Sequence, residues 1–383
     1  MDKMNAPKLV ILSLDPRGVI IDGKEEVISR QNNYGVNLKK FNTQQKYEFI
    51  IFSGSKNKSQ INLYESVRIL NLCNPTFNFF KFAWKARKIA LELNFDIKLF
   101  VVGDCWESYW SAFTLNFFLK IKSPIQIQLH GDIADPKWRK INYRNRARFL
   151  LAKLALTKAS SIRAVTKYQA ENLVKAFGIK REKIVVVPVP IHVLNKPVAL
   201  KTERPKTIGL IGRIHQDRGI WDFINLIRIL NSSSKDFKVV VIGDGPSKDK
   251  FLLKLSSVIS KNRIIYLGQV PESQLRKAWK KIGVLVSMAP VESYGRVIRE
   301  SLISGVPVWA TASAGVNDLM DNCKKGEVKL LDLSKSESYL DKDFRSLLKT
   351  KVSSDFSKRF IKENNTYAAK LASSWINIIN KSK

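Results

Sequence analysis

The segment Ala289–Val308 reads APVESYGRVIRESLISGVPV, and the fold is predicted from it. The apolar runs at Val284–Ser287 and Val306–Ala310 predict two buried strands. Between them the pattern predicts a helix over Tyr294–Ser304, which the following Gly-Val-Pro closes. A strand, a helix and a strand in this order predict a βαβ unit in a parallel sheet.

The same alternation extends along the chain in both directions. In the first half, strands are predicted at Lys8–Ser13, Tyr47–Phe52, Ile97–Val102, Ile125–Leu129, Ser161–Val165 and Lys183–Val187, and helices at Phe79–Leu93, Glu107–Ile121, Arg144–Ala159 and Lys167–Phe177. In the second half, further strands are predicted at Thr207–Ile211, Lys238–Ile242 and Arg263–Leu267, and further helices at Gly219–Leu230, Ser247–Ile259 and Glu272–Lys281. This rhythm predicts an α/β protein with two Rossmann-like lobes facing a cleft, with ligands at the carboxyl ends of the strands.

A proline-rich joint separates the two halves. The chain from Pro188 to Pro205 carries several prolines and is predicted to be a linker. We therefore predict an N-terminal lobe over residues 1–195 and a C-terminal lobe over residues 196–352. The remaining segment, 353–383, is predicted to be a helix that packs back on the first lobe, with Trp375 on its apolar face.

The composition points to an anionic partner. The 383 residues carry a formal net charge of +33, which favours nucleic acid, an acidic lipid surface or phosphorylated substrates. Between Lys137 and Val198 the only acids are Glu171 and Glu182, against fifteen Lys and Arg residues. Three cysteines without metal-binding spacing, and no apolar stretch typical of a signal peptide or membrane span, predict a cytoplasmic protein.

Two other stretches are predicted to be structural. Asp341-Lys-Asp343 lies in a polar region with no strand before it, which predicts solvated surface rather than a metal site. The aromatic stretch over residues 107–120 predicts a helix whose large side chains are buried in the core.

Two glutamates in the opening segment are spaced for a long polar ligand. Glu292 and Glu300 are eight residues apart, which is about 12 Å along a helix. That length is on the scale of a nucleotide sugar, and carboxylates accept hydrogen bonds from vicinal hydroxyls. The helix start between them offers a diphosphate the backbone amides of Tyr294, Gly295, Arg296 and Val297. The simpler alternative is that Glu292 caps the helix and Glu300 lies on its surface.

A second candidate motif opens the C-terminal half. The segment Gly209–Gly219, GLIGRIHQDRG, is predicted to run from a strand through a turn at Gly212 into a helix. Arg213 and Arg218 beside that helix start would neutralise a diphosphate. The alternative is that both are surface cations near a turn.

These motifs together resemble one enzyme family. Glu292 and Glu300 match the E-x7-E pattern of the retaining glycosyltransferases of family 4, also described as glycosyl transferases group 1, which have the two-lobed GT-B fold. Arg213 and Arg218 match that family's G-R-x4-K-G stretch, with arginine in place of lysine. The resemblance implies that Glu292 contacts the donor sugar and Glu300 the ribose hydroxyls.

The resemblance also implies two site residues in the first half. His130, in the strand-end sequence QLHGD, corresponds to a histidine that contacts the donor sugar near the reaction centre. Gly18, after the first strand, resembles the family's glycine loop, where donor phosphate and acceptor meet. A lone histidine is otherwise often structural. The predicted catalytic residues are thus Glu292, His130 and Arg213, and the predicted donor-binding residues are Arg218, Glu300, Gly18, Gly295, Tyr294, Arg296, Val297 and Gly212.

The sequence therefore predicts a hexosyltransferase that moves a sugar from a nucleotide diphosphate sugar to a lipid-linked or saccharide acceptor, with retention and with no metal or other cofactor. The basic first lobe is predicted to attach peripherally to anionic lipid at the inner face of the cytoplasmic membrane, and no specific nucleic acid is expected. The alternatives are a non-catalytic nucleic-acid-binding protein, motivated by the charge, and a GT-B enzyme that performs epimerisation or phosphorolysis.

Overall fold

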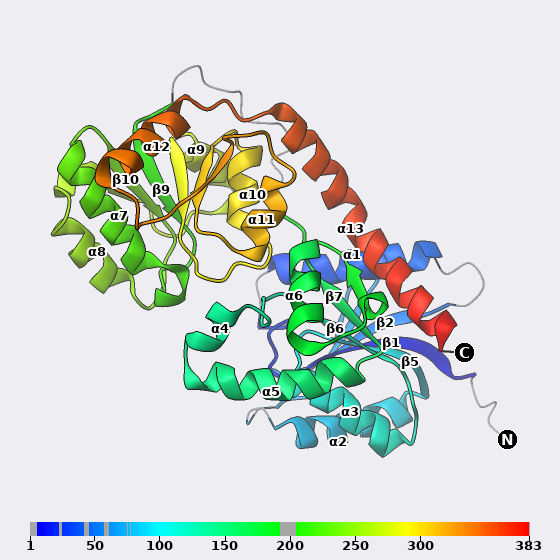
Figure 1. Cartoon of the computed structure of the whole chain (residues 1–383). Helices are drawn as coiled ribbons and strands as arrows, with labels where there is room; N and C mark the ends of the chain where they lie inside the picture. Colours follow the sequence, from blue (N-terminus) through cyan, green and yellow to red (C-terminus); the bar gives the residue numbers. More distant parts are fainter. Residues whose placement is uncertain are drawn as a thin grey trace. The chain divides into compact units, whose positions relative to one another are not determined.

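The computed structural model describes residues 6–22, 25–41, 46–56, 61–74, 76, 78–191 and 204–382, and it divides into two compact units (Figure 1). The first unit comprises residues 1–134, 142–188 and 366–383, and the second comprises residues 135–141 and 189–365. The short segment 135–141 thus groups with the second unit, and the end of the chain groups with the first. Most of the predicted linker, residues 192–203, lies outside the described residues.

The first unit is built on an eight-stranded sheet. In spatial order its strands are β3 (Ile61–Leu63), β4 (Arg68–Asn71), β2 (Glu48–Ser53), β1 (Lys8–Asp15), β5 (Phe95–Val102), β6 (Ile125–Gln128), β7 (Ser161–Ala164) and β8 (Ile184–Val186). All neighbouring strands are parallel except β3, which pairs antiparallel with β4 at one edge. The central strands are almost entirely buried, as expected when helices cover both faces of a parallel sheet.

Helices lie on both faces of this sheet. Those of the first unit are α1 (Glu25–Phe41), α2 (Phe79–Glu92), α3 (Glu107–Leu119), α5 (Tyr143–Lys158), α6 (Lys167–Phe177), the 3-10 turn η1 (Arg181–Lys183) and the last part of α13 (Ser354–Lys381). In Figure 1, α1 and α13 lie on one side of the strands, and α2, α3 and α5 lie on the other. None of the helices in the described part of the chain is long and apolar enough to cross a membrane.

The end of α13 completes the core of the first unit. Trp375 is fully buried in a cluster that also contains side chains from α1, β1 and β2. Its indole Nε1 donates to Oε1 of Gln126 over 2.8 Å, and its ring centroid lies 5.0 Å from that of Phe49. The last part of α13 is therefore an integral layer of the first unit.

The second unit repeats the α/β pattern. Its six parallel strands, in spatial order, are β11 (Ile264–Tyr266), β10 (Lys238–Ile242), β9 (Thr207–Ile211), β12 (Val284–Ser287), β13 (Val308–Ala310) and β14 (Val328–Leu330). Its helices are α4 (Pro136–Lys140), α7 (Ile220–Ser233), α8 (Lys248–Ser256), α9 (Glu272–Trp279), α10 (Arg296–Ile303), α11 (Ala314–Met320) and α12 (Glu337–Lys349), with 3-10 turns η2 (Gln216–Arg218) and η3 (Lys261–Arg263). The prediction of two Rossmann-like lobes is confirmed.

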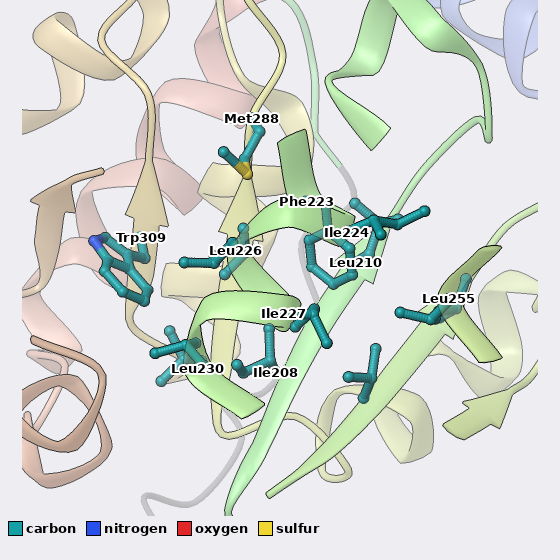
Figure 2. Packing of buried hydrophobic residues seen from close by; sticks show 14 of the residues in the cluster. Ile208, Leu210, Phe223, Ile224, Leu226, Ile227, Leu230, Leu255, Met288 and Trp309 are labelled. Carbon is teal, nitrogen blue, oxygen red and sulfur yellow. The ribbon is translucent and has the colours of Figure 1, made fainter. Parts of the chain in front are cut away.

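The apolar residues of α7 recur with the helical period and form one side of the core of the second unit. Phe223, Ile224, Ile227 and Leu230 recur at the spacing of one helical face, and all four are buried. Figure 2 shows this face packed on the apolar strand β9, where Ile208 is fully buried.

Several elements are absent from the prediction. They are α1, β3, β4, α4, α11, β14 and α12. The 17-residue helix α1 has only three buried residues, Tyr34, Gly35 and Leu38, and its remaining positions are mostly polar. A pattern with so few apolar positions gives little periodic signal.

The prediction of solvated surface for Asp341-Lys-Asp343 is wrong in part. The motif lies within α12, where Asp343 is buried and forms an ion pair with Lys329. Asp341 pairs with Arg345 one helical turn later, over 2.7 Å. The two carboxylates are thus held by separate cations, and the described residues contain no cluster of three or more His, Cys, Asp or Glu side chains suited to a metal ion.

The prediction of burial for the aromatic stretch 107–120 also needs correction. Tyr109 and Leu115 of α3 are buried, but Phe113 and Phe117 are exposed. The helix is apolar all round, so its sequence alone does not distinguish a buried helix from one with an exposed apolar side.

Candidate functional site

The loop that joins β12 to α10 places Glu292 at the start of a helix. Gly295 ends this loop with φ +75°, a left-handed conformation that glycine adopts without strain. Its backbone N–H donates to Oε1 of Glu292 over 3.0 Å. The carboxylate therefore caps α10, and the amide of Gly295, which the sequence assigned to a phosphate, already has a protein acceptor. Arg296 and Val297, in the first turn of α10, are partly exposed.

Arg218 is the cation that lies against Glu292. It ends η2, and its Nη1 donates to Oε2 of Glu292 over 3.2 Å. The side chain of Arg218 is 48% exposed and that of Glu292 is 21% exposed. A guanidinium carries five N–H donors in a planar fork, so an anion can bind Arg218 beside the carboxylate. The pair orients Glu292 and keeps a positive charge open to solvent.

Two glycines hold this loop against its neighbours. Gly219 has φ +67°, and a Cβ there would lie 1.9 Å from the carbonyl oxygen of Met288. Gly315, in the first turn of α11, donates its N–H to the carbonyl oxygen of Glu292 over 2.7 Å. A Cβ at Gly315 would lie 2.7 Å from the backbone of Tyr294. A side chain at either position would therefore displace the loop that carries Glu292.

The site lies where the order of the second sheet reverses. From β9 the chain passes to β10 on one side, and later to β12 on the other side of β9. Gly212 and Arg213 follow β9, and Glu292 follows β12, so these residues extend from the carboxyl ends of adjacent strands. Gly212 has φ +129° with open space where a Cβ would point, and Arg213 is exposed. In open α/β sheets this is the position at which ligands bind.

Glu300 lies in the second turn of α10 and is partly exposed. Because α10 begins at Arg296, only the second half of the interval from Glu292 to Glu300 is helical. The estimate of 12 Å, which assumes a helix over the whole interval, therefore does not apply. Both carboxylates nonetheless belong to one loop–helix unit.

Arg299 contributes to this site and has no role in the sequence prediction. Its guanidinium carbon lies 3.7 Å from the ring centroid of Tyr294, and its Nη2 donates to Oδ2 of Asp318 over 2.7 Å. Arg299 and the Tyr294 ring are both buried, so the contact is shielded from water. Tyr294 thus supports the loop beneath Glu292. The signal available in the sequence was an arginine on the apolar side of a predicted helix.

In the first unit, His130 follows β6 and is exposed to solvent. Desolvation, with the positive charges of Arg163 and Arg30, lowers the pKa of His130 to about 3. A lowered pKa makes the imidazole neutral at pH 7, in a form with one N–H donor and one acceptor.

Gly18, in the loop after β1, is required for a close turn. It has φ +73°, and a Cβ there would lie 2.5 Å from Cα of Ser55. The amides that follow it, those of Val19 and Ile20, donate to the Asp15 carboxylate over 3.1 and 2.7 Å. The Asp15 carboxylate therefore holds the two amides that follow Gly18. Nine of the eleven predicted site residues lie in the second unit, while Gly18 and His130 lie in the first.

Two family models match the chain in succession. The model described as Glycosyltransferase Family 4 matches residues 31–193, and the model described as Glycosyl transferases group 1 matches residues 194–365. Residues 194–365 form a group 1 glycosyltransferase domain. The second match contains the whole loop–helix unit of Glu292 and both arginines of the strand β9 turn.

A curated relative of the chain is 2-deoxystreptamine glucosyltransferase from Streptomyces kanamyceticus, which is 27% identical over 189 residues, 46% of this chain and 48% of the relative. The chain spans about half the length or less of the first curated relatives that it matches.

Solved structures match almost the whole chain. The apo form of the lipopolysaccharide outer core galactosyltransferase WaaB has a TM-score of 0.69 at 15% identity, covering 98% of this chain and all of WaaB. HepE from Anabaena, in complex with UDP and glucose, has a TM-score of 0.63 at 17% identity, covering 95% of this chain and 99% of HepE. These likenesses show the shared GT-B fold of two Rossmann-like lobes.

Proposed function

We propose that this protein is a retaining hexosyltransferase that moves a sugar from a nucleotide diphosphate sugar to a lipid-linked or saccharide acceptor. The observation that carries the proposal is the Arg218–Glu292 pair at the carboxyl ends of adjacent strands and at the start of α10. Solvent-accessible cations and a helix N-terminus together favour a diphosphate.

Each side chain of the site has a role in donor binding. Arg218 and Arg213 neutralise the diphosphate, together with the positive end of the α10 dipole at Arg296 and Val297. Glu300 accepts hydrogen bonds from the ribose hydroxyls, and Glu292, fixed by its two hydrogen bonds, accepts from the sugar hydroxyls. These groups supply the charge stabilisation for which other enzymes use a metal, so we propose that none is required.

The transfer forms one bond and breaks one. The bond from the anomeric carbon to the diphosphate oxygen breaks, and the acceptor hydroxyl oxygen bonds to the same carbon on the same face. The acceptor proton passes to the departing phosphate oxygen, so no side-chain base is needed. Negative charge grows on the diphosphate as the bond breaks, and Arg213 and Arg218 stabilise it.

His130 is proposed to orient the donor sugar. A neutral imidazole donates one hydrogen bond and accepts another, which suits a hydroxyl group. Its lowered pKa keeps it in that form through the neutral range. A protonated imidazole would add a positive charge beside the anomeric carbon, where the reaction itself develops positive charge.

The acceptor is proposed to be presented at a membrane. WaaB is described as acting on the lipopolysaccharide outer core and HepE binds UDP and glucose, so a nucleotide sugar donor and a glycan attached to lipid are the first candidates. The excess of basic residues favours peripheral attachment to the inner face of the cytoplasmic membrane.

Activity assays with alanine variants test the proposal. The protein is incubated with UDP- and GDP-sugars and a lipid extract, and sugar transfer is measured for the wild type, Glu292→Ala and Arg213→Ala. Both variants are expected to lose transfer while keeping the wild-type melting temperature. Arg345→Ala, which removes a cation of α12 paired with Asp341, is the matched control and should retain activity. Full activity in either site variant would refute the assignment.

Product analysis in the same assay separates the alternatives. A free epimerised sugar would indicate an epimerase, and a sugar phosphate formed with inorganic phosphate would indicate phosphorolysis. The charge of +33 is the observation that favours nucleic-acid binding. Tight binding of DNA or RNA that survives physiological salt would support it, while binding that disappears with salt would be non-specific attraction.

A further inference from the structure

Helix α5 exposes a stripe of apolar side chains. Its sequence, YRNRARFLLAKLALTK, contains no acidic residue. Leu150 is 66% exposed, and Tyr143, Leu151 and Leu154 are also exposed. At 3.6 residues per turn, positions 143, 147, 150, 151 and 154 project from the same side of the helix. Soluble monomers rarely leave such a row of large apolar side chains in water without a function.

Cations border this stripe on both sides. The helical spacing places Arg146 and Lys153 along one border, and Arg144 and Lys158 along the other. All four are exposed. Long basic side chains beside an apolar stripe can extend their charged ends toward an anionic surface while their stems stay in apolar surroundings.

The neighbouring helix α3 continues the apolar surface. Phe117 is 76% exposed and Phe113 is also exposed. The ammonium of Lys158 lies 5.6 Å from the ring centroid of Phe113, and the indole Nε1 of Trp106 donates to the carbonyl oxygen of Arg148 over 3.1 Å. These contacts hold α3 and α5 side by side, as Figure 1 shows.

Helix α2 extends the surface on the other side of α3. Trp84, Phe80 and Leu91 are exposed on it. The Trp84 ring lies 5.6 Å from the ring of Phe118, in the last turn of α3, and Nε of Arg87 donates to the carbonyl oxygen of Phe118 over 3.2 Å. A hollow of about 590 Å³ lies between these two helices. We call the exposed side of α2, α3 and α5 the three-helix face.

The three-helix face is positively charged. Helix α2 and the turn after α3 add six cations to those of α5, namely Lys81, Lys85, Arg87, Lys88, Lys120 and Lys122. The three helices contain only two acids, Glu92 and Glu107, and both form ion pairs, with Lys88 and Arg17. Even with these pairs formed, basic residues far outnumber acidic ones around the exposed apolar side chains.

We propose that the three-helix face docks on an anionic phospholipid bilayer, with its leucine and aromatic side chains inserted at the interface. This proposal deepens the membrane attachment in the proposed function by assigning the surface and the side chains that bind lipid. Tryptophan and tyrosine suit the headgroup region, leucine and phenylalanine suit the acyl boundary, and lysine and arginine suit acidic headgroups. Charge complementarity and the combination of these residue types favour a bilayer over a protein groove.

Vesicle co-sedimentation of the full-length protein tests the proposal without using its activity. Vesicles of phosphatidylcholine alone are compared with vesicles of phosphatidylcholine and phosphatidylglycerol in equal parts. The wild type should bind the acidic vesicles, and Leu150→Glu/Leu154→Glu should weaken that binding by about tenfold or more because it removes apolar insertion and adds repulsion. The control is Leu253→Glu, which changes a leucine of α8 that is 75% exposed.

A second variant, Phe117→Ser on α3, should also weaken binding, and it keeps the proposal testable if the α5 variant unfolds. Transfer to a water-soluble acceptor should be unchanged in both variants, so a failure of docking is distinguishable from a failure of the proposed transfer. Equal binding of the wild type and both variants to acidic vesicles would overturn the proposal. Equal binding of the wild type to both kinds of vesicle would also overturn it. If polyglutamate displaces the protein from acidic vesicles equally well for the wild type and both variants, the face binds an acidic protein instead, which would overturn the proposal too.

Discussion

The loops after β1 and after β12 each contain a carboxylate that accepts backbone N–H groups, but the two carboxylates have different further partners. Each places a carboxylate, Asp15 or Glu292, so that it accepts backbone N–H groups from the loop that follows its strand. Asp15 is buried, and it also accepts from the Ser53 hydroxyl over 2.8 Å. Glu292 instead has an exposed arginine as its second partner. The Asp15 carboxylate thus binds only groups of the protein interior, whereas the Glu292 carboxylate lies beside an accessible cation that is able to bind an anion.

Loss of Glu292 should therefore have the largest effect on activity and little effect on stability. For Glu292→Ala we expect kcat/KM for sugar transfer to fall by about a thousandfold or more, because an oriented group at the reacting sugar is lost. The melting temperature should fall little, since the side chain is partly exposed and only its hydrogen bonds with Gly295 and Arg218 are lost. Steady-state kinetics measures the loss of activity, and thermal unfolding measures the change in stability. A variant that is unfolded would show that Glu292, like Asp15, has a structural role.

Loss of Asp15 should have the opposite effect. Asp15→Ala leaves the amides of Val19 and Ile20 and the Ser53 hydroxyl without their acceptor, which should lower the free energy of unfolding by about 3 kcal/mol. Urea unfolding measures the change. Asp249→Ala, at an exposed position of α8, is the control and should change stability little. A destabilisation no larger than that of the control would show that the β1 loop does not depend on its carboxylate.

Loss of the Arg299 guanidinium, which lies over the Tyr294 ring, should have a smaller effect on activity, because it acts through the position of the loop. In Arg299→Met the ion pair to Asp318 and the contact with the Tyr294 ring are both lost. We expect kcat/KM to fall by about tenfold, mostly through a higher KM for the donor, because the loop that holds Glu292 is less well positioned. Arg299→Lys should recover part of the loss. Equal falls in kcat for both variants with unchanged KM would argue against a positioning role.

The smallest effect that we expect is on the pH dependence of stability, to which His130 contributes. Because its pKa is lowered to about 3, the folded protein keeps this imidazole neutral from pH 5 to pH 8. In the unfolded chain the pKa of this histidine is near 6.5. As the pH falls to 5, the unfolded state therefore binds a proton at His130 and the folded state does not, which favours unfolding. The wild type should therefore lose more stability than His130→Asn between pH 7.5 and pH 5. A larger loss in the variant would show that the native pKa is raised.

Where the sequence pattern is strong, the structure matches it closely. The predicted bounds of β9, β10, β12 and α6 are the observed ones, because each is a compact apolar run or a regular amphipathic helix. The helix α1 was not predicted because few of its positions are buried. Single-sequence patterns detect elements that bury a regular row of apolar side chains, and they miss those that do not.

The loop–helix unit that carries the predicted site residues could be predicted from the sequence, but its contacts could not. The spacing of Glu292 and Glu300 indicated the loop–helix unit, but only the structure shows that Glu292 caps α10 and pairs with Arg218. These contacts depend on how β9 and β12 lie beside each other, which no local pattern contains. The contact of Arg299 with Tyr294 depends in the same way on tertiary packing.

The most direct test of the central claim is calorimetric binding of nucleoside diphosphates to the second unit's site in the full chain. UDP, GDP and ADP are titrated into the wild type, Arg218→Ala and the control Arg345→Ala. At least one nucleoside diphosphate should bind the wild type and the control with one-to-one stoichiometry. Binding to Arg218→Ala should be weaker by about tenfold or more, as expected for the loss of a charge-assisted contact to phosphate. If none of the three binds, or if Arg218→Ala binds as tightly as the wild type, Arg218 is not part of a nucleoside diphosphate site.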